Sequence, residues 1–339
     1  MKRRIATIIL PLALVCALAA GTVAAAGGAE SERRALGPYP ALGDCEIFPD
    51  PPRSVGPQAP SLATQAAWNQ DISGAPVHPR SKAIIAYVNR HGDRFLHPDF
   101  GSPRPYGFPY SVVGATQRKL PIRYTAYGPE SDRGPFPIPK GAPVEGGAGS
   151  DGDRHVLVID RVRCRLFELY RSFFKGRPAP RWEADSGVEW NLRSAALRTD
   201  GFTSADAAGL PIFPGLVRYD EASSGRIDHA LRVTFESTRN AWIHPASHCA
   251  GDTRNASAPP MGMRMRLRAG YSLRRLSGAA KAIGTALKRY GLIVADNGSN
   301  WFFSGTSDRR WSDENLNGLK GIPGSAFQVV RSAARTHVC

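Results

Sequence analysis

The densest group of side chains able to carry proton-transfer chemistry lies in residues 200–229, among glycines and prolines. Irregular backbone that carries acids, a histidine and arginines is typical of a site built on a rigid scaffold. We therefore take Asp206, Glu221, His229 and Tyr219 as candidate catalytic residues.

Two carboxylic acids of this group could cleave a glycosidic bond, because that reaction needs one protonated and one ionised carboxyl group. Residues adjacent on a strand point to opposite faces, so the neighbours Asp220 and Glu221 cannot form the pair. The partners must come from different segments. This favours Asp206 with Glu221 as the acid and the base of a hydrolase.

The same segment also suits β-elimination of an acidic glycan. Arg232 or Arg266 would neutralise the uronate carboxylate, and His229 or Tyr219 would take the proton. His229, however, precedes an alternating run, residues 229–235, and shares its apolar face. A buried histidine bonded to the backbone is therefore the structural alternative.

Arginines provide the candidate substrate-binding groups. Residues 263–268 alternate methionine or leucine with arginine, so a strand here would have one dry face and one exposed cationic face. A tryptophan in the polar stretch 307–317 could stack on a sugar ring, and we expect it to be exposed. The candidate substrate-binding residues are Arg218, Arg232, Arg264, Arg266, Arg268 and Trp311.

No metal or cofactor is predicted. His244 and His248 flank Pro245 and could share one face of a helical turn, but the proline and the adjacent Cys249 favour a capping or surface role. The loop 146–153 has two aspartates without the spacing of a calcium loop. There is no His-Glu-x-x-His, P-loop or Gly-x-Ser-x-Gly motif, which weakens metalloprotease, nucleotide hydrolase and α/β-hydrolase interpretations.

The elements that must position these residues are mostly short strands. Residues 155–160 and 164–170 predict a hairpin, because two β-rich runs are separated by a few polar residues. Asn297 and Gly298, between the runs 292–296 and 300–304, predict another. The proline-rich stretch 134–147 can hardly be a helix or a central strand, so it should wrap around the surface of another part of the fold.

One helix is well signalled after the arginine-rich strand. Ser277 can cap it, apolar residues repeat at helical spacing up to Tyr290, and Gly291 can end it. Many short strands with long connections and one or two helices predict a mainly β, single-domain two-sheet sandwich or jelly roll. We assign residues 81–339 to this globular domain and residues 27–80 to an extension rich in Pro, Gly and Ala.

The first residues have the order of a secretory signal peptide, ending near residue 26. Basic residues at 2–4 precede an apolar run and then small residues. No later stretch is long and apolar enough to span a membrane. Lipid anchoring at Cys16 would need a small residue where Val15 stands. We expect a secreted protein, extracellular or periplasmic.

Four cysteines remain after removal of the leader, namely Cys45, Cys164, Cys249 and Cys339. In an exported chain they predict two disulfides and no free thiol. Three pairings are open.

The chain carries a net charge of +15. The excess positive charge is uneven, since residues 261–290 contain eight basic residues and no acid. Such a field favours polyanions. Export makes an anionic polysaccharide or cell-envelope polymer the expected partner, and nucleic acid is not expected. A solvated basic face that only maintains solubility is the alternative.

Several stretches together resemble an uncharacterised family of secreted bacterial and fungal proteins. The resemblance covers most of residues 81–330, and residues 204–220 are its most specific part. It implies a single folded, exported unit and carries no activity or site residues. The stretches are residues 130–147, 152–170, 197–229, 259–267 and 295–305.

Taken together, the residues favour a secreted β-sandwich that acts on an extracellular, acidic glycan as a hydrolase or a lyase. The groove would be lined by the arginines of residues 263–268 and by residues 206–229. A non-catalytic binding module for envelope or matrix polyanions is the alternative. An extracellular nuclease is disfavoured, because no acid and histidine set with metal-ligand spacing accompanies the basic residues.

Overall fold

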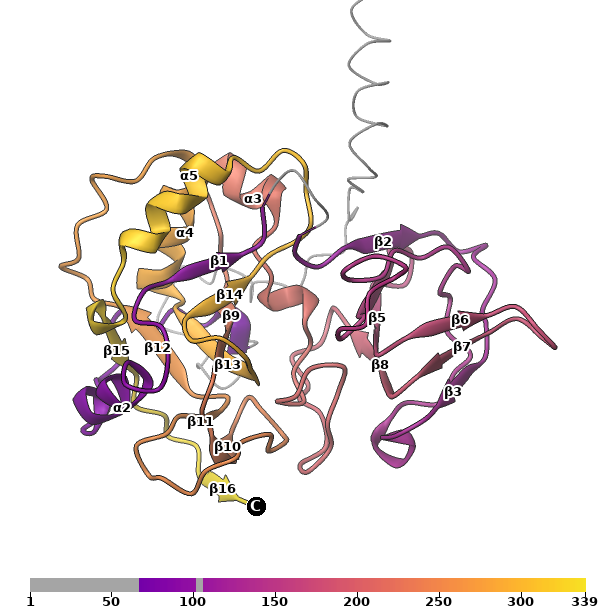
Figure 1. Ribbon diagram of the computed structural model, residues 1–339, viewed down its shortest axis with the longest axis horizontal. Coiled ribbons are helices and arrows are strands. Elements are labelled where there is room, and N and C mark those ends of the chain that lie inside the picture. The colour runs from indigo at the N-terminus through magenta and orange to yellow at the C-terminus, as the bar shows by residue number, and fades with distance from the viewer. Residues whose placement is uncertain (1–66, 102–105) are drawn as a thin grey trace, which may run out of the picture. The chain divides into compact units, whose positions relative to one another are not determined.

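The computed structural model describes residues 67–101 and 106–339, which form a mainly β structure (Figure 1). The predicted class is confirmed. The strands of these residues fall into four sheets, with six, four, three and three strands, so a count of two sheets is not confirmed. Four α-helices accompany them, where the sequence predicted one or two. The predicted signal peptide and Cys45 lie outside the described residues.

The apolar runs of the C-terminal half build the large sheet. Its strand order is β1 (His97–Asp99), β14 (Phe302–Ser304), β9 (Leu231–Phe235), β13 (Leu292–Asn297), β12 (Arg264–Leu267) and β15 (Phe327–Val329). β9 pairs with β13 in parallel and with β14 in antiparallel orientation. Helix α4 (Gly278–Arg289) packs its Ile283 and Leu287 into the core of this sheet.

Side chains alternate between a dry and a polar face of the large sheet. Val233, Met265 and Leu267 are fully buried in the apolar core. The opposite face carries Arg232 and Arg266, because successive residues on a strand point to opposite sides. The predicted two-sided character of residues 263–268 is therefore confirmed.

The predicted hairpin around Asn297 and Gly298 does not form. Both runs are strands, but β9 lies between them and pairs with each. Local turn chemistry favoured a hairpin, and pairing with a strand from earlier in the chain replaced it. This arrangement puts the C-terminal end of β13 beside β9 rather than beside β14.

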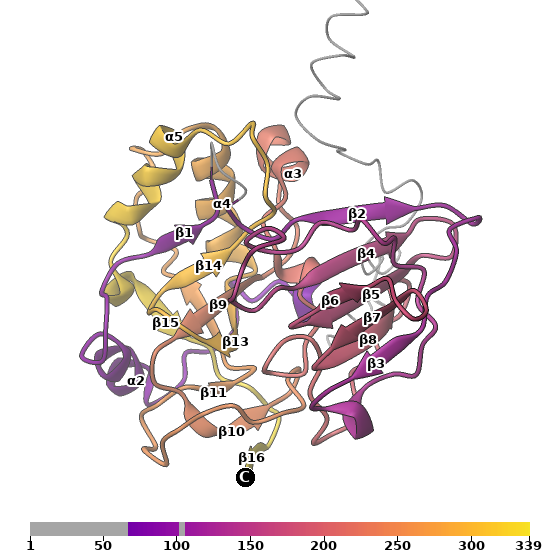
Figure 2. The same ribbon diagram turned by 45° about the vertical axis from the view of Figure 1, so that its right-hand side comes forward.

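The four-stranded and three-stranded sheets of residues 110–191 pack face to face (Figure 2). The first contains β2 (Tyr110–Val113), β4 (Val156–Asp160), β5 (Arg165–Tyr170) and β8 (Ser186–Asn191). The second contains β3 (Ile122–Tyr124), β7 (Arg181–Ala184) and β6 (Phe173–Lys175). β4 and β5 pair in antiparallel orientation, as the predicted hairpin requires.

Apolar side chains cover both faces of β4, and all five of its residues are buried. Val156 and Val158 face the three-stranded sheet, while Leu157 and Ile159 face a second core. The proline-rich stretch 134–147 has no helix or regular strand, as predicted, yet its Phe136 and Ile138 are buried in the first of these cores.

Residues 67–80 belong to the folded unit, although the sequence placed them in the extension. Trp68 is 3% exposed and Ile72 is 5% exposed. The Trp68 carbonyl accepts from the Ala230 amide at 2.7 Å, and the Ile72 amide donates to the Arg289 carbonyl at 2.8 Å. Helix α2 (Ser81–Val88) follows and packs against β15.

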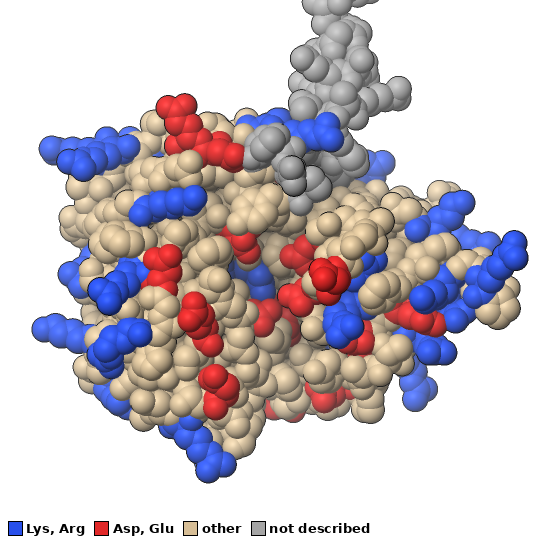
Figure 3. Space-filling model, viewed as in Figure 1, with Lys and Arg blue, Asp and Glu red and all other residues tan. Residues whose placement is uncertain are grey.

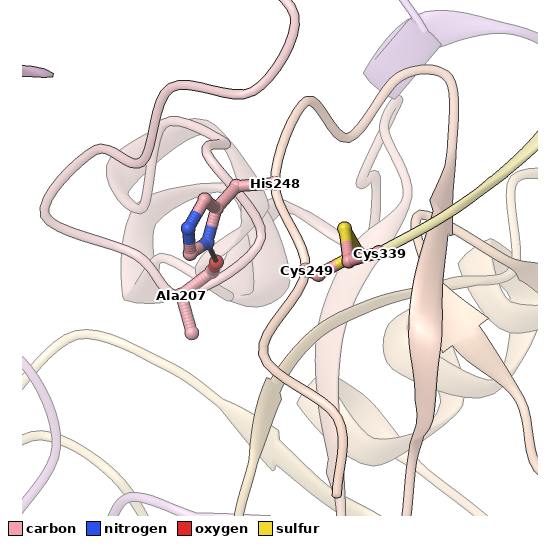
Figure 4. Close-up of a disulfide and its surroundings, with 4 residues drawn as sticks. All are labelled: Ala207, His248, Cys249 and Cys339. Atoms are coloured by element: carbon pink, nitrogen blue, oxygen red, sulfur yellow. Dashed lines mark hydrogen bonds between the residues drawn. A yellow bond between two sulfur atoms is a disulfide. The ribbon is translucent and has the colours of Figure 1, made fainter. Parts of the chain in front are cut away.

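A small sheet near the C-terminus contains β10 (Arg239–Ile243), β11 (Pro260–Met261) and β16 (Thr336–Val338). A disulfide between Cys249 and Cys339 lies beside it (Figure 4). Cys164 is also disulfide-bonded. Disulfides of this kind fit an oxidising compartment.

The predicted helix is confirmed as α4, with Ser277 at its N-cap. Its cap is supplied by a neighbour: Asn315 of helix α5 (Asp313–Asn317) accepts from the Ala280 amide at 2.9 Å and donates to the Ser277 carbonyl at 2.9 Å.

Candidate functional site

Arg232 is the centre of a buried charge cluster on the polar face of the large sheet. β9 places it there with 3% of its surface exposed. Its Nη2 atom donates to Asp206 Oδ1 at 2.7 Å and lies 3.5 Å from Asp296 Oδ2. Its Nη1 atom donates to Ser304 Oγ at 2.8 Å. One guanidinium therefore joins β9 to β13, β14 and the loop that carries Asp206.

The two carboxyl groups beside Arg232 differ in exposure. Asp206 is 1% exposed, and its Oδ2 atom has no hydrogen-bond partner among the described residues. Asp296 keeps 24% of its side chain exposed. Burial raises the pKa of Asp206 against the opposing effect of Arg232. Burial and then repulsion from Asp206 raise the pKa of Asp296 to about 7.

A second ion pair adjoins this cluster. His155 Nδ1 lies 2.5 Å from Glu145 Oε2, and His155 Nε2 lies 3.0 Å from the carbonyl of Ala205, next to Asp206. Both ring nitrogens face oxygen acceptors, so both carry a hydrogen. Burial opposes that charge, but the Glu145 carboxylate outweighs it and raises the pKa of His155 to about 9. Burial favours the neutral form of Glu145, yet His155 lowers its pKa.

Arg154 holds the loop that brings Glu145 to His155. Its backbone is in the left-handed region with φ 51°, and its guanidinium lies 4.3 Å from the centroid of the Phe173 ring. It donates to the carbonyls of Ser172 at 3.1 Å and Ala148 at 2.9 Å. A non-glycine residue in this backbone region needs such support from its surroundings.

Two aromatic rings line the cluster. The Arg232 guanidinium lies 5.2 Å and the His155 ring 5.3 Å from the centroid of the Phe108 ring. The Tyr170 ring lies 5.5 Å from His155. Burial and then Asp153 raise the pKa of Tyr170, with Asp296 contributing in the same direction. Tyr170 at the end of β5 therefore shares its electrostatic surroundings with Asp296 at the end of β13.

The register of the large sheet extends a row of side chains away from Asp296. Asp296 is paired with Thr234, Thr234 with Phe302, and Phe302 with His97. Paired residues stand on the same face, and all four are half-buried. The rings of His97 and Phe302 stack with centroids 4.7 Å apart. The row spans four strands, or about 14 Å at the usual strand spacing.

Figure 3 shows a hollow in this face, between the large sheet and the four-stranded sheet, with acidic side chains gathered around it. Most Lys and Arg side chains visible in this view lie toward the periphery. The cations of the cluster, Arg232 and His155, are buried, whereas Asp153 is exposed and Glu145 and Asp296 are half-buried. The solvent-facing part of this region is therefore acidic.

Glu168 of β5 holds the loop that carries Asp206. It is fully buried on β5 and accepts from the amides of Ile212 and Phe213 and from Trp190 Nε1 at 2.9 to 3.1 Å. Burial raises the pKa of Glu168 to about 7, although these donors favour its ionised form. Ser204 adds two bonds within the loop, to the amide of Asp206 at 2.9 Å and the carbonyl of Leu210 at 2.6 Å.

Glu221 and His229, predicted as catalytic, bond to each other and to groups around helix α3 (Tyr219–Ser224). Glu221 lies on this helix, accepts from the Arg218 amide at 2.9 Å and pairs with the Arg218 guanidinium at 2.6 Å. His229 is 5% exposed, and its nitrogens lie 2.9 Å from Glu221 Oε1 and 2.8 Å from the Ala230 carbonyl. The network caps α3 and ties it to β9. The predicted pairing of Glu221 with Asp206 is not observed, because each has other partners.

Trp311 is buried, contrary to the expectation that it is exposed. It is 4% exposed, and its indole N–H donates to the Thr306 carbonyl at 2.9 Å. Tyr219 packs edge-on against it at 5.0 Å, and Arg310 covers Tyr219 at 4.0 Å. The residues next to Trp311 in sequence are polar, so nothing in the sequence indicated that its ring packs against Tyr219.

The arginines of β12 do not form an exposed cationic face. Arg264 donates to Gln70 Oε1 at 2.9 Å and to the Tyr290 carbonyl at 2.9 Å, and burial lowers its pKa to about 10. Arg266 is 9% exposed and donates to the carbonyls of Ile72 and Ser73. Only Arg268 of the three is exposed. Residues 70–73 cover this face, so the predicted arginine-lined groove is absent there.

His244 and His248 do not converge on a metal site. His244 Nε2 lies 2.9 Å from Asp200, while His248 Nδ1 lies 2.9 Å from the Ala207 carbonyl (Figure 4). Across residues 67–101 and 106–339, no group of three or more His, Cys, Asp or Glu residues is arranged to hold a metal ion.

The structure thus brings Asp206 and Arg232 of the predicted set together and adds three residues that sequence reasoning missed. Asp296 ends the apolar run of β13, and His155 begins that of β4. Glu145 lies in the proline-rich stretch. The available signal for Asp296 and His155 was a polar residue at the end of a strand predicted to be buried.

Comparisons with known proteins identify no relative. No protein-family model, no curated protein and no solved structure matches the chain. The resemblance to a family of secreted proteins therefore stays a prediction. Within the described residues, no helix has the length and apolar character needed to cross a bilayer.

Proposed function

We propose that this protein cleaves glycosidic bonds in an extracellular glycan, with Asp296 as the proton donor. The observation that carries the proposal is a solvent-accessible carboxyl group whose pKa is raised to about 7. A carboxyl group held partly protonated near neutral pH is what protonation of a glycosidic oxygen requires.

The surroundings of Asp296 supply the rest of the chemistry. Its proton passes to the leaving oxygen, which keeps the electron pair of the broken C–O bond. Water then adds to the sugar carbon and returns a proton to Asp296. The ionised Glu145 and the exposed Asp153 favour the positive charge that develops on the sugar ring. Asp206 is too buried to contact substrate and acts by raising the pKa of Asp296.

The row from Asp296 to the stacked rings of His97 and Phe302 offers a track for a linear chain. Aromatic side chains suit the flat C–H faces of sugars. The acidic surroundings of Asp296 disfavour a uronate at the cleaved bond. The carboxylates of the predicted acidic glycan must therefore bind elsewhere on the surface. Secretion, as the N-terminal residues predict, would bring the protein to such a polymer.

A reducing-end assay on a panel of neutral, N-acetylated and acidic polysaccharides tests the proposal. The wild type should release new ends from at least one polymer, with activity falling as the pH rises through 7. Asp296→Asn should lower the rate by about 10² to 10⁴. The control Glu314→Gln changes an exposed carboxylate on helix α5, which packs against α4, and should behave as the wild type. Full activity in the Asp296 variant would exclude this role.

A non-catalytic binding module remains the second candidate, because a basic groove exists outside the hollow, as described below. The same assay separates the two functions. Binding of a polymer without release of new ends from any member of the panel would favour the module.

A further inference from the structure

A second concave site lies between helix α2 and the edge of the large sheet, and it differs in charge from the hollow. It is an open groove of about 900 Å³. One wall is a single face of α2, since Lys82, Ile85, Ala86 and Asn89 recur at helical spacing. The other wall consists of Arg268, Ser325, Phe327 and Gln328, and His78 and Pro79 also line it.

The lining of the groove is cationic. Lys82 and Arg268 are both exposed, and the lining contains no carboxylate. No ion pair joins either side chain to an acid in the part of the chain that the structure describes. Burial and then Arg80 and Arg331 lower the pKa of His78, which shows that further cations lie near.

Hydrogen bonds to the sheet hold the walls in place. The His78 amide donates to the Val329 carbonyl at 2.9 Å, and Ser81 Oγ accepts from the Val329 amide at 2.9 Å. Asn89 Oδ1 accepts from Trp301 Nε1 at 2.9 Å. Arg268 donates to the Ser325 carbonyl. The groove is therefore formed before any ligand arrives, which reduces the ordering entropy of binding.

We propose that this groove binds the carboxylate groups of an acidic polysaccharide, as a site separate from Asp296. Charge complementarity favours a polyanion. Single-stranded nucleic acid is disfavoured, because such binding relies on stacking bases on exposed aromatic rings and the only aromatic side chains of the lining are His78 and the buried Phe327. Val77 and Pro79 add exposed apolar surface to the lining, but two cations without a carboxylate favour an anionic polymer over an amphipathic helix.

Direct binding measurements test this site without reference to catalysis. An oligogalacturonate, a neutral cello-oligosaccharide of equal length and a single-stranded DNA of equal charge serve as probes in calorimetry at fixed salt. The double variant K82Q/R268Q should bind the oligogalacturonate about tenfold more weakly than the wild type. The control R275Q/K281Q removes the same charge from exposed positions outside the groove and should stay within twofold.

Four results would overturn the proposal. These are no measurable binding by the wild type, an equal loss in both double variants, equal affinity for the neutral probe, and tighter groove-dependent binding of DNA. Matching thermal melts of the two double variants ensure that folding does not explain a difference. Asp296→Asn should bind the oligogalacturonate as the wild type does, so failure of the groove and failure of the catalytic proposal give different results.

Discussion

Replacing Glu145 by Gln should abolish a pH dependence of stability that originates at His155. The pKa of His155 is raised from 6.5 to about 9, because the Glu145 carboxylate outweighs the effect of burial. Since the folded-state pKa lies above the unfolded one, this stability is fully present below pH 6.5 and is lost as the pH rises through about 9. A shift of this size corresponds to roughly 3 kcal/mol, at about 1.4 kcal/mol per pKa unit.

Urea unfolding at pH 6, 7, 8, 9 and 10, with the disulfides intact, measures the effect as the difference between wild type and variant. We expect Glu145→Gln to be less stable by roughly 3 kcal/mol at pH 6 and nearly equal to the wild type above pH 9. Taking the difference removes the contributions of titrating groups that lie apart from His155. Asp93→Asn is the control, because it removes a carboxylate 2.8 Å from the half-buried His97 in a pair that solvent screens. A difference between wild type and Glu145→Gln that stays constant with pH would refute the reasoning.

Three further substitutions test the supports of the site. Glu168→Leu leaves two backbone amides and the Trp190 indole without an acceptor, so urea unfolding should show a loss of roughly 3 kcal/mol or more, with Glu168→Gln losing less. Arg266→Ala should speed proteolysis near residues 70–73, whereas Arg268→Ala should not, because Arg266, unlike Arg268, is buried under that segment. Cys339→Ser opens a loop with a sequence separation of 90, and a thermal melt should show a loss of up to about 4 kcal/mol.

The sequence predicted the elements of the fold better than their partners. Continuous or alternating apolar runs identified β4, β5, β9 and β12, because each buries at least one face. The hairpin predicted from the Asn297-Gly298 pair was wrong. A turn signal describes four residues and cannot show that β9 lies between the flanking strands. The arginines of β12 were placed on the correct face, but no local pattern shows that residues 70–73 cover it.

The candidate site was predicted only in part, because it too depends on contacts between segments distant in sequence. Asp206 and Arg232 were chosen for their residue types, and they do meet. Asp296 and His155 were missed, because each lies at one end of a run that the sequence assigned to a core strand and gains its altered pKa from segments distant in sequence. Glu221 and His229 have the right chemistry, but their hydrogen-bonding capacity is used within their own neighbourhood.

The position of β9 between β13 and β14 also determines when the charge cluster can exist. β9 and Arg232 are synthesised before both of the strands that flank β9 in the sheet. β1, from the other end of the described chain, pairs only with β14. Sheets closed by such distant segments fold slowly, since the entropy cost of closing the long loop arises before the strand contacts offset it. A nascent chain that stops before Phe302 therefore has Arg232 and Asp206 but no closed sheet to hold them, and the hollow is among the last features to form.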